Sequence, residues 1–385
     1  MTTEGTIIDE DGFGVIPIIT DDNRNFEIVK RYTLTNKTKA SVTLITWGAG
    51  IQGIRVPNYR GILGDVVLGF DDIDGYWNNR HVGRILGRVT RRVSTDISPS
   101  LSHDPLVSGI NNKSPGFDSV NWDSYILGEQ VVMSHLSRND RFHPGEVLTQ
   151  VKYSWSDNNE LFMDLRASCT RPTPVDITSF CLFNLAGHGM GSEELNKHVV
   201  SINASKWLHS DVRTKLPSGA VRSVRKTKFD LRTPTELNLK RLESIPGGGY
   251  DHFFCVNSPS TLCYRFHARV LHPDSGRVLE VNSNQAGLHF YTANEFPRLQ
   301  EDLHYWDRSE SPCRRDKNNN SRGKSSGIPA KGGVMYKRHS GFSISPRNYP
   351  DSVNFNHFPS NILYPGHDYH YAMALKFGIK KSIPE

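Results

Sequence analysis

The chain has 385 residues, of which 36% are hydrophobic and 22% charged, and its formal net charge is +6. This length and composition allow a sizeable buried core, either in one large β-domain or in two ordinary domains. No window approaches the roughly 18 consecutive apolar residues of a membrane-spanning helix, which excludes that class of membrane protein.

The N-terminal 22 residues are acidic and polar. They lack the basic region followed by an apolar region that marks a secretory signal. We therefore expect a loose N-terminus over residues 1–22. We also expect a cytoplasmic protein, with nuclear access as the alternative.

Strand patterns dominate the rest of the chain. Short apolar and β-branched runs, bounded by Gly, Pro, Asn and Asp, recur from end to end, the clearest being residues 42–47, 51–56, 66–70, 161–165 and 288–291. The best helix candidate is short, over residues 235–245. Many short strands, without a linker or a fixed repeat, predict an all-β fold: one large antiparallel β-sandwich domain over residues 1–385.

Cysteine and histidine patterns point away from metal and cofactor chemistry. The five cysteines form no C-x-x-C pair and are odd in number, so we expect free thiols and no zinc site or disulfide framework. His367 and His370 form an H-x-x-H pair, but they follow Pro365-Gly366, which indicates a turn and no metal site. The chain has neither G-x-G-x-x-G after a strand nor a P-loop, so we expect no nucleotide cofactor.

One stretch carries the whole excess of positive charge. Between residues 306 and 338, nine Lys and Arg against three Asp and Glu leave +6. Within it, residues 314–333 are rich in Asn, Ser, Gly, Lys and Arg, a composition that cannot bury much apolar surface. We expect a basic disordered loop there, one that could engage an acidic protein or nucleic acid.

Several short motifs follow one another along the chain, namely residues 87–93 (GRVTRRV), 183–187 (FNLAG), 249–252 (GYDH), 290–294 (FYTAN), 349–354 (YPDSVN) and 363–366 (LYPG). Together they resemble the aldose 1-epimerase (galactose mutarotase) family, collinearly from about residue 41 to 377. The resemblance implies a galactose mutarotase-like supersandwich. It also implies a hexose bound on the concave face of one sheet.

The family's reaction opens and recloses a sugar ring, so it needs a base at the anomeric hydroxyl and an acid at the ring oxygen. The resemblance places the family's glutamate base at Ser345 and its histidine acid at Phe180. A second family histidine falls at Asn111. None of these three side chains suits the proton transfer, so we predict no catalytic residues at the family positions.

The resemblance also indicates sugar-contacting residues. Arg92 and Asp251 match the family, whereas Arg91 replaces an asparagine and His289 a glutamine. Structural roles are the alternatives: a core ion pair for Arg92, a turn for Asp251 and a buried core position for His289. If the transfer is right, one site gathers Arg91, Arg92, Asn111, Phe180, Asp251, His289 and Ser345.

Three functions remain open from the sequence. The first is a catalytically inactive member with a carbohydrate-binding or protein-interaction role. The second is an active aldose 1-epimerase that interconverts hexose anomers with a relocated acid and base, for which His81, His188 and His252 are candidates. The third is an interaction protein that uses the basic stretch 306–338, although the aromatic residues only flank that stretch.

Overall fold

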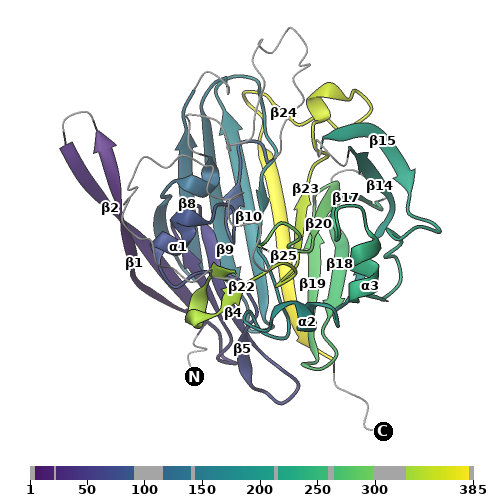
Figure 1. Cartoon of the computed structure of the whole chain (residues 1–385). Helices are drawn as coiled ribbons and strands as arrows, with labels where there is room; N and C mark the ends of the chain where they lie inside the picture. The colour runs from purple at the N-terminus through teal and green to yellow at the C-terminus, as the bar shows by residue number, and fades with distance from the viewer. Residues whose placement is uncertain are drawn as a thin grey trace, which may run out of the picture.

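The structure is a computed structural model that describes residues 5–20, 23–90, 116–139, 144–211, 216–258, 264–297 and 327–380. These residues form three large sheets, and every strand pair in them is antiparallel. Three two-stranded sheets accompany them. The predicted all-β fold and antiparallel sandwich are thereby confirmed (Figure 1).

The N-terminal sheet corrects the expectation of a loose N-terminus. Its strands, in spatial order, are β1 (Ile7–Thr20), β2 (Asn23–Thr35), β3 (Ser41–Ile45), β4 (Gly50–Pro57) and β5 (Leu63–Asp65). β1 and β2 form a long hairpin that projects from the body (Figure 1). Ile16 and Val29 of this hairpin are buried, and this apolar packing orders a segment that is polar on average.

The largest sheet has nine strands and runs through the middle of the molecule (Figure 1). Its spatial order is β16 (Thr235–Glu236), β13 (Val199–Ile202), β18 (Arg265–Leu271), β19 (Arg277–Ser283), β25 (Tyr369–Ile379), β10 (Glu160–Cys169), β9 (Val147–Trp155), β8 (Gln130–Ser137) and β7 (Asp123–Leu127).

A second five-stranded sheet positions the candidate site. Its order is β15 (Pro217–Ser223), β14 (Ala204–Ser210), β17 (Asp251–Val256), β20 (Gly287–Tyr291) and β23 (Ser343–Arg347). Phe254 lies opposite Leu288, Phe290 lies opposite Ile344, and all four are buried in the main core. Because side chains alternate between the faces of a strand, the odd-numbered residues of these three strands face away from that core.

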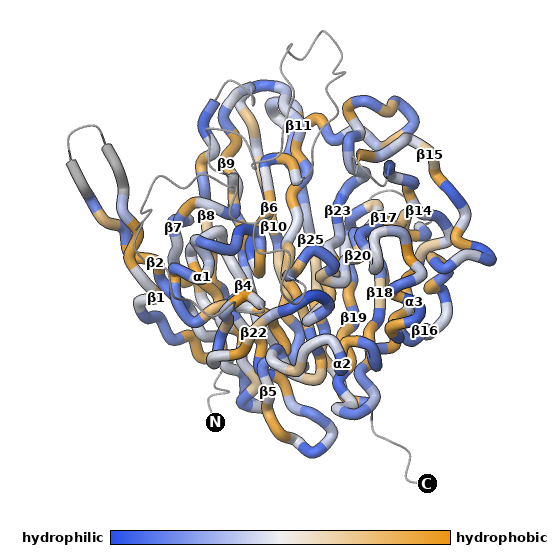
Figure 2. Tube along the Cα trace, viewed as in Figure 1, coloured by the Kyte–Doolittle hydropathy of each residue, from blue (hydrophilic) through white to orange (hydrophobic). Residues whose placement is uncertain are grey.

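Hydrophobic residues from all three sheets make up the main core, for example Tyr32, Val151 and Phe290. Figure 2 shows hydrophobic and hydrophilic residues interleaved along the strands, as expected for strands with one face in the core. Three cysteines of the described residues, Cys169, Cys181 and Cys255, are free thiols. Burial raises the pKa of Cys255 to about 11, so this thiol stays protonated near neutral pH.

Short elements complete the fold. The two-stranded sheets are β11 (Thr173–Pro174) with β24 (Ile362–Leu363), β12 (Thr178–Ser179) with β6 (Ile85–Leu86), and β21 (Ile328–Pro329) with β22 (Met335–Tyr336). The helices are α1 (Ile73–Asn78), α2 (Gly191–Leu195) and α3 (Leu239–Ser244), and the 3₁₀ turns are η1 (Phe117–Ser119), η3 (Lys331–Gly333) and η4 (Ser352–Asn354). α3 lies inside the predicted helix 235–245, where the Asn238 side chain caps the Arg241 amide. Among the described residues, no helix combines the length and the apolar character needed to cross a membrane.

The predicted basic loop 314–333 needs a correction at its C-terminal end. Residues 314–326 lie outside the described residues, but residues 327–333 belong to the fold. Lys331 is buried, and its Nζ donates to Asp65 Oδ2 at 2.6 Å and to the Gln52 carbonyl at 2.9 Å. A buried, paired ammonium anchors this end to the N-terminal sheet, which composition averaged over the segment does not reveal.

Candidate functional site

The outward face of β17, β20 and β23 brings three of the predicted site residues together. His289 of β20 lies directly opposite Ser345 of β23 and opposite Phe253 of β17. Asp251 is two residues before Phe253 and therefore shares its face. We call the strip made by Asp251, His289, Tyr291 and Ser345 the site strip.

The Asp251–His289 pair is a polar contact within this strip. His289 Nε2 lies 2.7 Å from Asp251 Oδ1, and the two side chains are 9% and 12% exposed. The strands place the pair, since Asp251 is opposite Tyr291 and hence diagonal to His289. A carboxylate held against an imidazole keeps the ring in one orientation, ready to bind or to exchange a proton.

Aromatic rings extend the strip toward Phe180. The His289 and Tyr291 rings are stacked with centroids 6.4 Å apart, and the Phe180 and Tyr291 rings are 5.8 Å apart. The Thr178 hydroxyl donates to the Pro346 carbonyl at 2.7 Å, which holds the segment before Phe180 against β23. Phe180 therefore reaches the same strip as His289 from a distant part of the chain.

Ser345 offers only a hydroxyl at its position. It is 2% exposed, and its Oγ lies 2.9 Å from the Oγ of Ser343 on the same strand. Neither Ser345 nor Phe180 carries a group that takes up a proton near neutral pH. The other predicted positions, Arg91, Arg92 and Asn111, lie outside the described residues.

A buried ion pair beside the strip was not predicted from the sequence. Arg347, two residues after Ser345 and on the same face, is paired with Asp176, and both side chains are almost fully buried. The Thr90 hydroxyl donates to Asp176 Oδ2 at 2.7 Å. This contact holds the end of the segment that leads to Arg91. The sequence signal was weak, a lone arginine on a strand and a lone aspartate far from it.

The three histidines considered as substitute acids contact residues outside the site strip. His252 lies on the opposite face of β17 from Asp251, packed against Trp207 and Phe229. His81 pairs with Asp118 at 2.9 Å, and His188 Nδ1 lies 3.1 Å from the Tyr336 hydroxyl. Burial lowers the pKa of His188, which keeps this imidazole neutral and a weak proton donor.

One cluster of metal-ligating side chains occurs among the described residues, away from the H-x-x-H pair of His367 and His370. Ligand atoms of Glu194, His272 and Asp274 lie within 4.8 Å of one another. Lys197 Nζ donates to Glu194 and to Asp274, at 2.8 Å each, so an ammonium already bridges the two carboxylates. His370 of the H-x-x-H pair contacts Asp164 at 2.8 Å.

Comparison with known proteins places the chain in one family. The family model for aldose 1-epimerase matches residues 30–376. The chain is 33% identical over 348 residues to galactose mutarotase from Bos taurus, covering 88% of this chain and 91% of the relative. It is 26% identical to aldose 1-epimerase from Streptococcus thermophilus, covering 91% and 94% of the two chains.

Solved structures agree on the fold. The aldose epimerase homologue from C. elegans superposes with a TM-score of 0.72 at 23% identity, covering 90% of this chain and 97% of the other. Galactose 1-epimerase from Lactobacillus acidophilus superposes with a TM-score of 0.70 at 18% identity, covering 97% and 100%. With the family model over residues 30–376 and the Bos taurus relative at 33% identity, the chain belongs to the aldose 1-epimerase family.

Proposed function

We propose that this chain is a catalytically inactive member of the aldose 1-epimerase family that retains a carbohydrate-binding site for a hexose. The observation that carries the proposal is the hydroxyl of Ser345, opposite His289, at the position that the family resemblance assigns to the glutamate base. The Ser345 hydroxyl is hydrogen-bonded to the Ser343 hydroxyl, and a hydroxyl does not accept a proton near pH 7. The anomeric hydroxyl of the sugar would therefore keep its proton.

Phe180 supports the same conclusion at the other end of the reaction. The resemblance assigns it to the acid that would protonate the ring oxygen, and a phenyl ring carries no exchangeable proton. The Phe180 ring packs against Tyr291 instead. With base and acid both replaced, the anomers should interconvert no faster than they do in water.

Sugar binding rests on what the strip still offers. Asp251 and His289 present polar atoms that can bond sugar hydroxyls, and Tyr291 and Phe180 present rings that can pack on the apolar face of a pyranose. Neither kind of contact needs a proton transfer. Binding can therefore persist after the catalytic groups are lost.

The test is an assay of anomeric conversion of galactose and glucose, run with purified protein and with buffer alone. We expect equal rates, together with sugar binding by calorimetry that Asp251→Asn weakens. Asp157→Asn removes an exposed carboxylate that pairs with Lys37, and it serves as the control that leaves binding unchanged. A rate above buffer that Asp251→Asn abolishes, or no sugar binding by the unaltered protein, would overturn the proposal.

A second candidate, an active epimerase with relocated groups, is favoured by one contact. The Asp251–His289 pair is an acid–base combination, directly across the strand pair from Ser345. A histidine oriented by a carboxylate can serve as a general base. His289→Gln distinguishes the two candidates, because it removes a catalytic rate in the second and changes only binding in the first.

The interaction role predicted for the basic stretch 306–338 rests on composition. Residues 306–326 lie outside the described residues, and the described remainder contributes Lys331 to a buried ion pair. We keep an acidic protein or nucleic acid as a proposal for this stretch. Pull-down of acidic partners at low salt by a variant that lacks residues 314–326 tests it.

A further inference from the structure

A second basic segment lies in the described part of the chain, over residues 222–243. Seven Lys and Arg against three Asp and Glu leave +4 there. The segment runs from the end of β15 through a turn into α3, at the right of the molecule in Figure 1. The near-neutral balance of the chain outside residues 306–338 hides this local excess.

Most of these cations are exposed, and the described part of the chain gives them no acidic partner. Exposed side chains include Arg222, Arg225, Lys226, Lys228 and Lys240. Among the described residues, the salt bridge within the segment joins Arg232 to Asp230 at 2.7 Å, and no carboxylate lies within 4.0 Å of those five. Uncompensated cations on one surface create a positive potential that attracts anions.

Tertiary contacts bring further cations to the end of α3. Lys228 Nζ donates to the Ser244 carbonyl at 3.3 Å, and Arg241 Nη1 donates to the Lys228 carbonyl at 3.0 Å. Arg338, from a distant segment, donates to the Gly248 carbonyl at 2.6 Å. We call Arg225, Lys226, Lys228, Lys240, Arg241 and Arg338 the basic surface.

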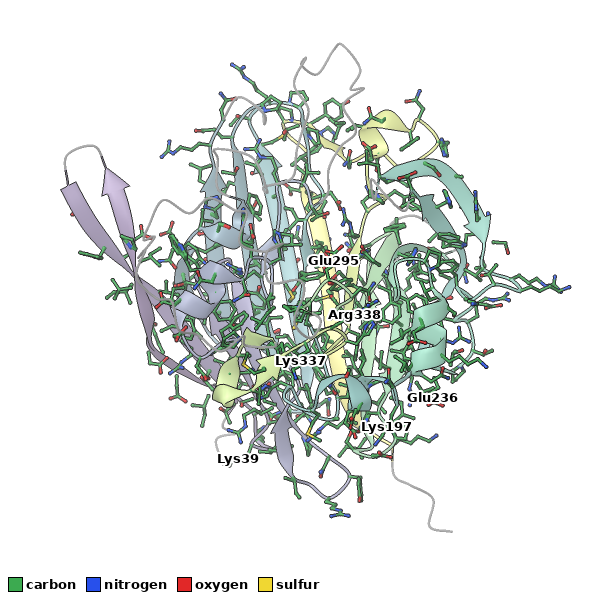
Figure 3. The ribbon with its side chains drawn as sticks, viewed as in Figure 1. Lys39, Lys197, Glu236, Glu295, Lys337 and Arg338 are labelled. Carbon is green, nitrogen blue, oxygen red and sulfur yellow. The ribbon has the colours of Figure 1, made fainter. Side chains whose placement is uncertain are left out.

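The basic surface borders β17, the strand that carries Asp251 of the site strip. Gly248, the partner of Arg338, is three residues before Asp251, the first residue of β17. Arg241 Nη1 also lies 3.4 Å from the hydroxyl of Tyr250, the neighbour of Asp251. Figure 3 shows Arg338 and Glu295 over the middle of the molecule, apart from Lys197 and Glu236 near its lower edge.

We propose that the basic surface binds an acidic glycan, a chain of sugars bearing sulfate or carboxylate groups, one residue of which occupies the site strip. This rests on the proposed sugar-binding function. The positive charge of the basic surface favours a polyanion. The position of this surface beside Asp251 favours a polyanion built of sugars. No aromatic side chain is exposed in residues 216–258, so this surface lacks the stacking platform typical of single-stranded nucleic acid sites.

The experiment measures binding of a size-defined sulfated oligosaccharide, its desulfated form, a polyglutamate peptide and oligodeoxythymidine. The altered protein is Arg225→Gln/Lys228→Gln/Lys240→Gln, which keeps Lys226 because of its left-handed φ of 59°. The matched control, Arg55→Gln/Arg60→Gln/Lys376→Gln, removes three exposed charges elsewhere. We expect the first triple variant to lose about tenfold in affinity for the sulfated chain at low salt, and the control to lose little.

Further results sharpen the outcome. Raising the salt concentration should weaken binding of the sulfated chain to the unaltered protein more than to the first triple variant. The reason is that salt screens exposed charge pairs, and the variant has fewer cations to form them. Asp251→Asn should weaken both the sulfated and the desulfated chain. Equal affinity of the two triple variants, tighter binding of the peptide or the oligonucleotide, or indifference to Asp251→Asn would overturn the proposal. If the basic surface binds the sulfated chain but a neutral hexose binds nowhere, the proposed function fails on its own.

Discussion

Buried charges in this protein are satisfied in two different ways, depending on the region. On the site strip and beside it, each charged group faces another ionisable group: Asp251 faces His289, and Asp176 faces Arg347. Elsewhere in the fold, three buried arginines donate mainly to backbone carbonyls, namely Arg84, Arg88 and Arg277.

Arg277 shows the second arrangement most clearly. It is 4% exposed, and it donates to the carbonyls of Val56, Leu185, Ala186 and Ile62. Burial lowers the pKa of Arg277. Burial also lowers the pKa of Arg84, to about 10, which still leaves that guanidinium charged at neutral pH. Backbone carbonyls are fixed in place by the fold and cannot turn toward a ligand. A paired carboxylate and imidazole, in contrast, can each form a hydrogen bond to a sugar hydroxyl.

The comparison predicts its largest effect at Arg277. Arg277→Met removes the donors of four carbonyls, and we expect a loss of about 3 kcal/mol in the free energy of unfolding. Chemical denaturation measures it. Arg232→Gln, which breaks the exposed Asp230 pair, should stay within about 0.5 kcal/mol. Similar losses in the two variants would contradict the structural role of Arg277.

Acid sensitivity gives the next effect. His198 is fully buried, its Nε2 accepts the Leu185 amide at 3.0 Å, and burial with neighbouring His272 lowers its pKa to about 3. The unfolded chain protonates this histidine near pH 6.5, so stability should fall as the pH drops below that value and stop falling near pH 3. At pH 5 this one group should cost about 2 kcal/mol.

Denaturation midpoints at pH 7.5, 6 and 5 test this expectation. His198→Gln should be less stable at pH 7.5, because its fit to Leu185 is lost, but should show a shallower decline with acid. A decline of equal slope in both proteins would assign the acid sensitivity to other groups.

A change on the site strip should affect binding more than stability. Asp251→Asn replaces a carboxylate that is 12% exposed, and we expect a loss of about 1 kcal/mol in unfolding free energy. Sugar affinity should fall about tenfold, because a charge-assisted contact becomes neutral. Calorimetric titration and denaturation of one preparation measure both. A loss of stability as large as that of Arg277→Met would remove the distinction between the regions.

The smallest effect is expected from shortening the basic loop 314–333. Deleting residues 314–326 should leave the denaturation midpoint unchanged, because Lys331 keeps its contacts with Asp65 and Gln52. Deleting residues 314–333 removes Lys331 and should cost about 2 kcal/mol, since the Asp65 carboxylate loses its ammonium partner. Pull-down of acidic partners at low salt tests the interaction role, which fails if the shorter deletion binds them unchanged.

The sequence predicted the fold class well and the segment boundaries less well. Strand alternation and turn residues are local properties, so the all-β fold was readable without coordinates. The N-terminal hairpin was missed because polar residues dominate residues 1–22, although Ile16 and its partner strand bury a common face. Averaged composition likewise assigned the anchored residues 327–333 to a disordered loop.

The site was predictable as a set of residues but not as an arrangement. The family phrases indicated Phe180, Asp251, His289 and Ser345, and they showed that a ring and a hydroxyl occupy proton-handling positions. They did not show that the His289 side chain is hydrogen-bonded to Asp251. Nor did they indicate the Asp176–Arg347 pair beside the strip, because its two residues are far apart in the chain.

The sequence alone therefore determined the all-β fold class, the family phrases and the chemical identity of each side chain at the site. Tertiary structure decided which charges meet. Strand register sets Asp251 diagonal to His289, and chain folding carries Arg277 to the carbonyls of Leu185 and Val56. Such pairings depend on distances across the sheets, and residues far apart in sequence leave no local pattern that records them.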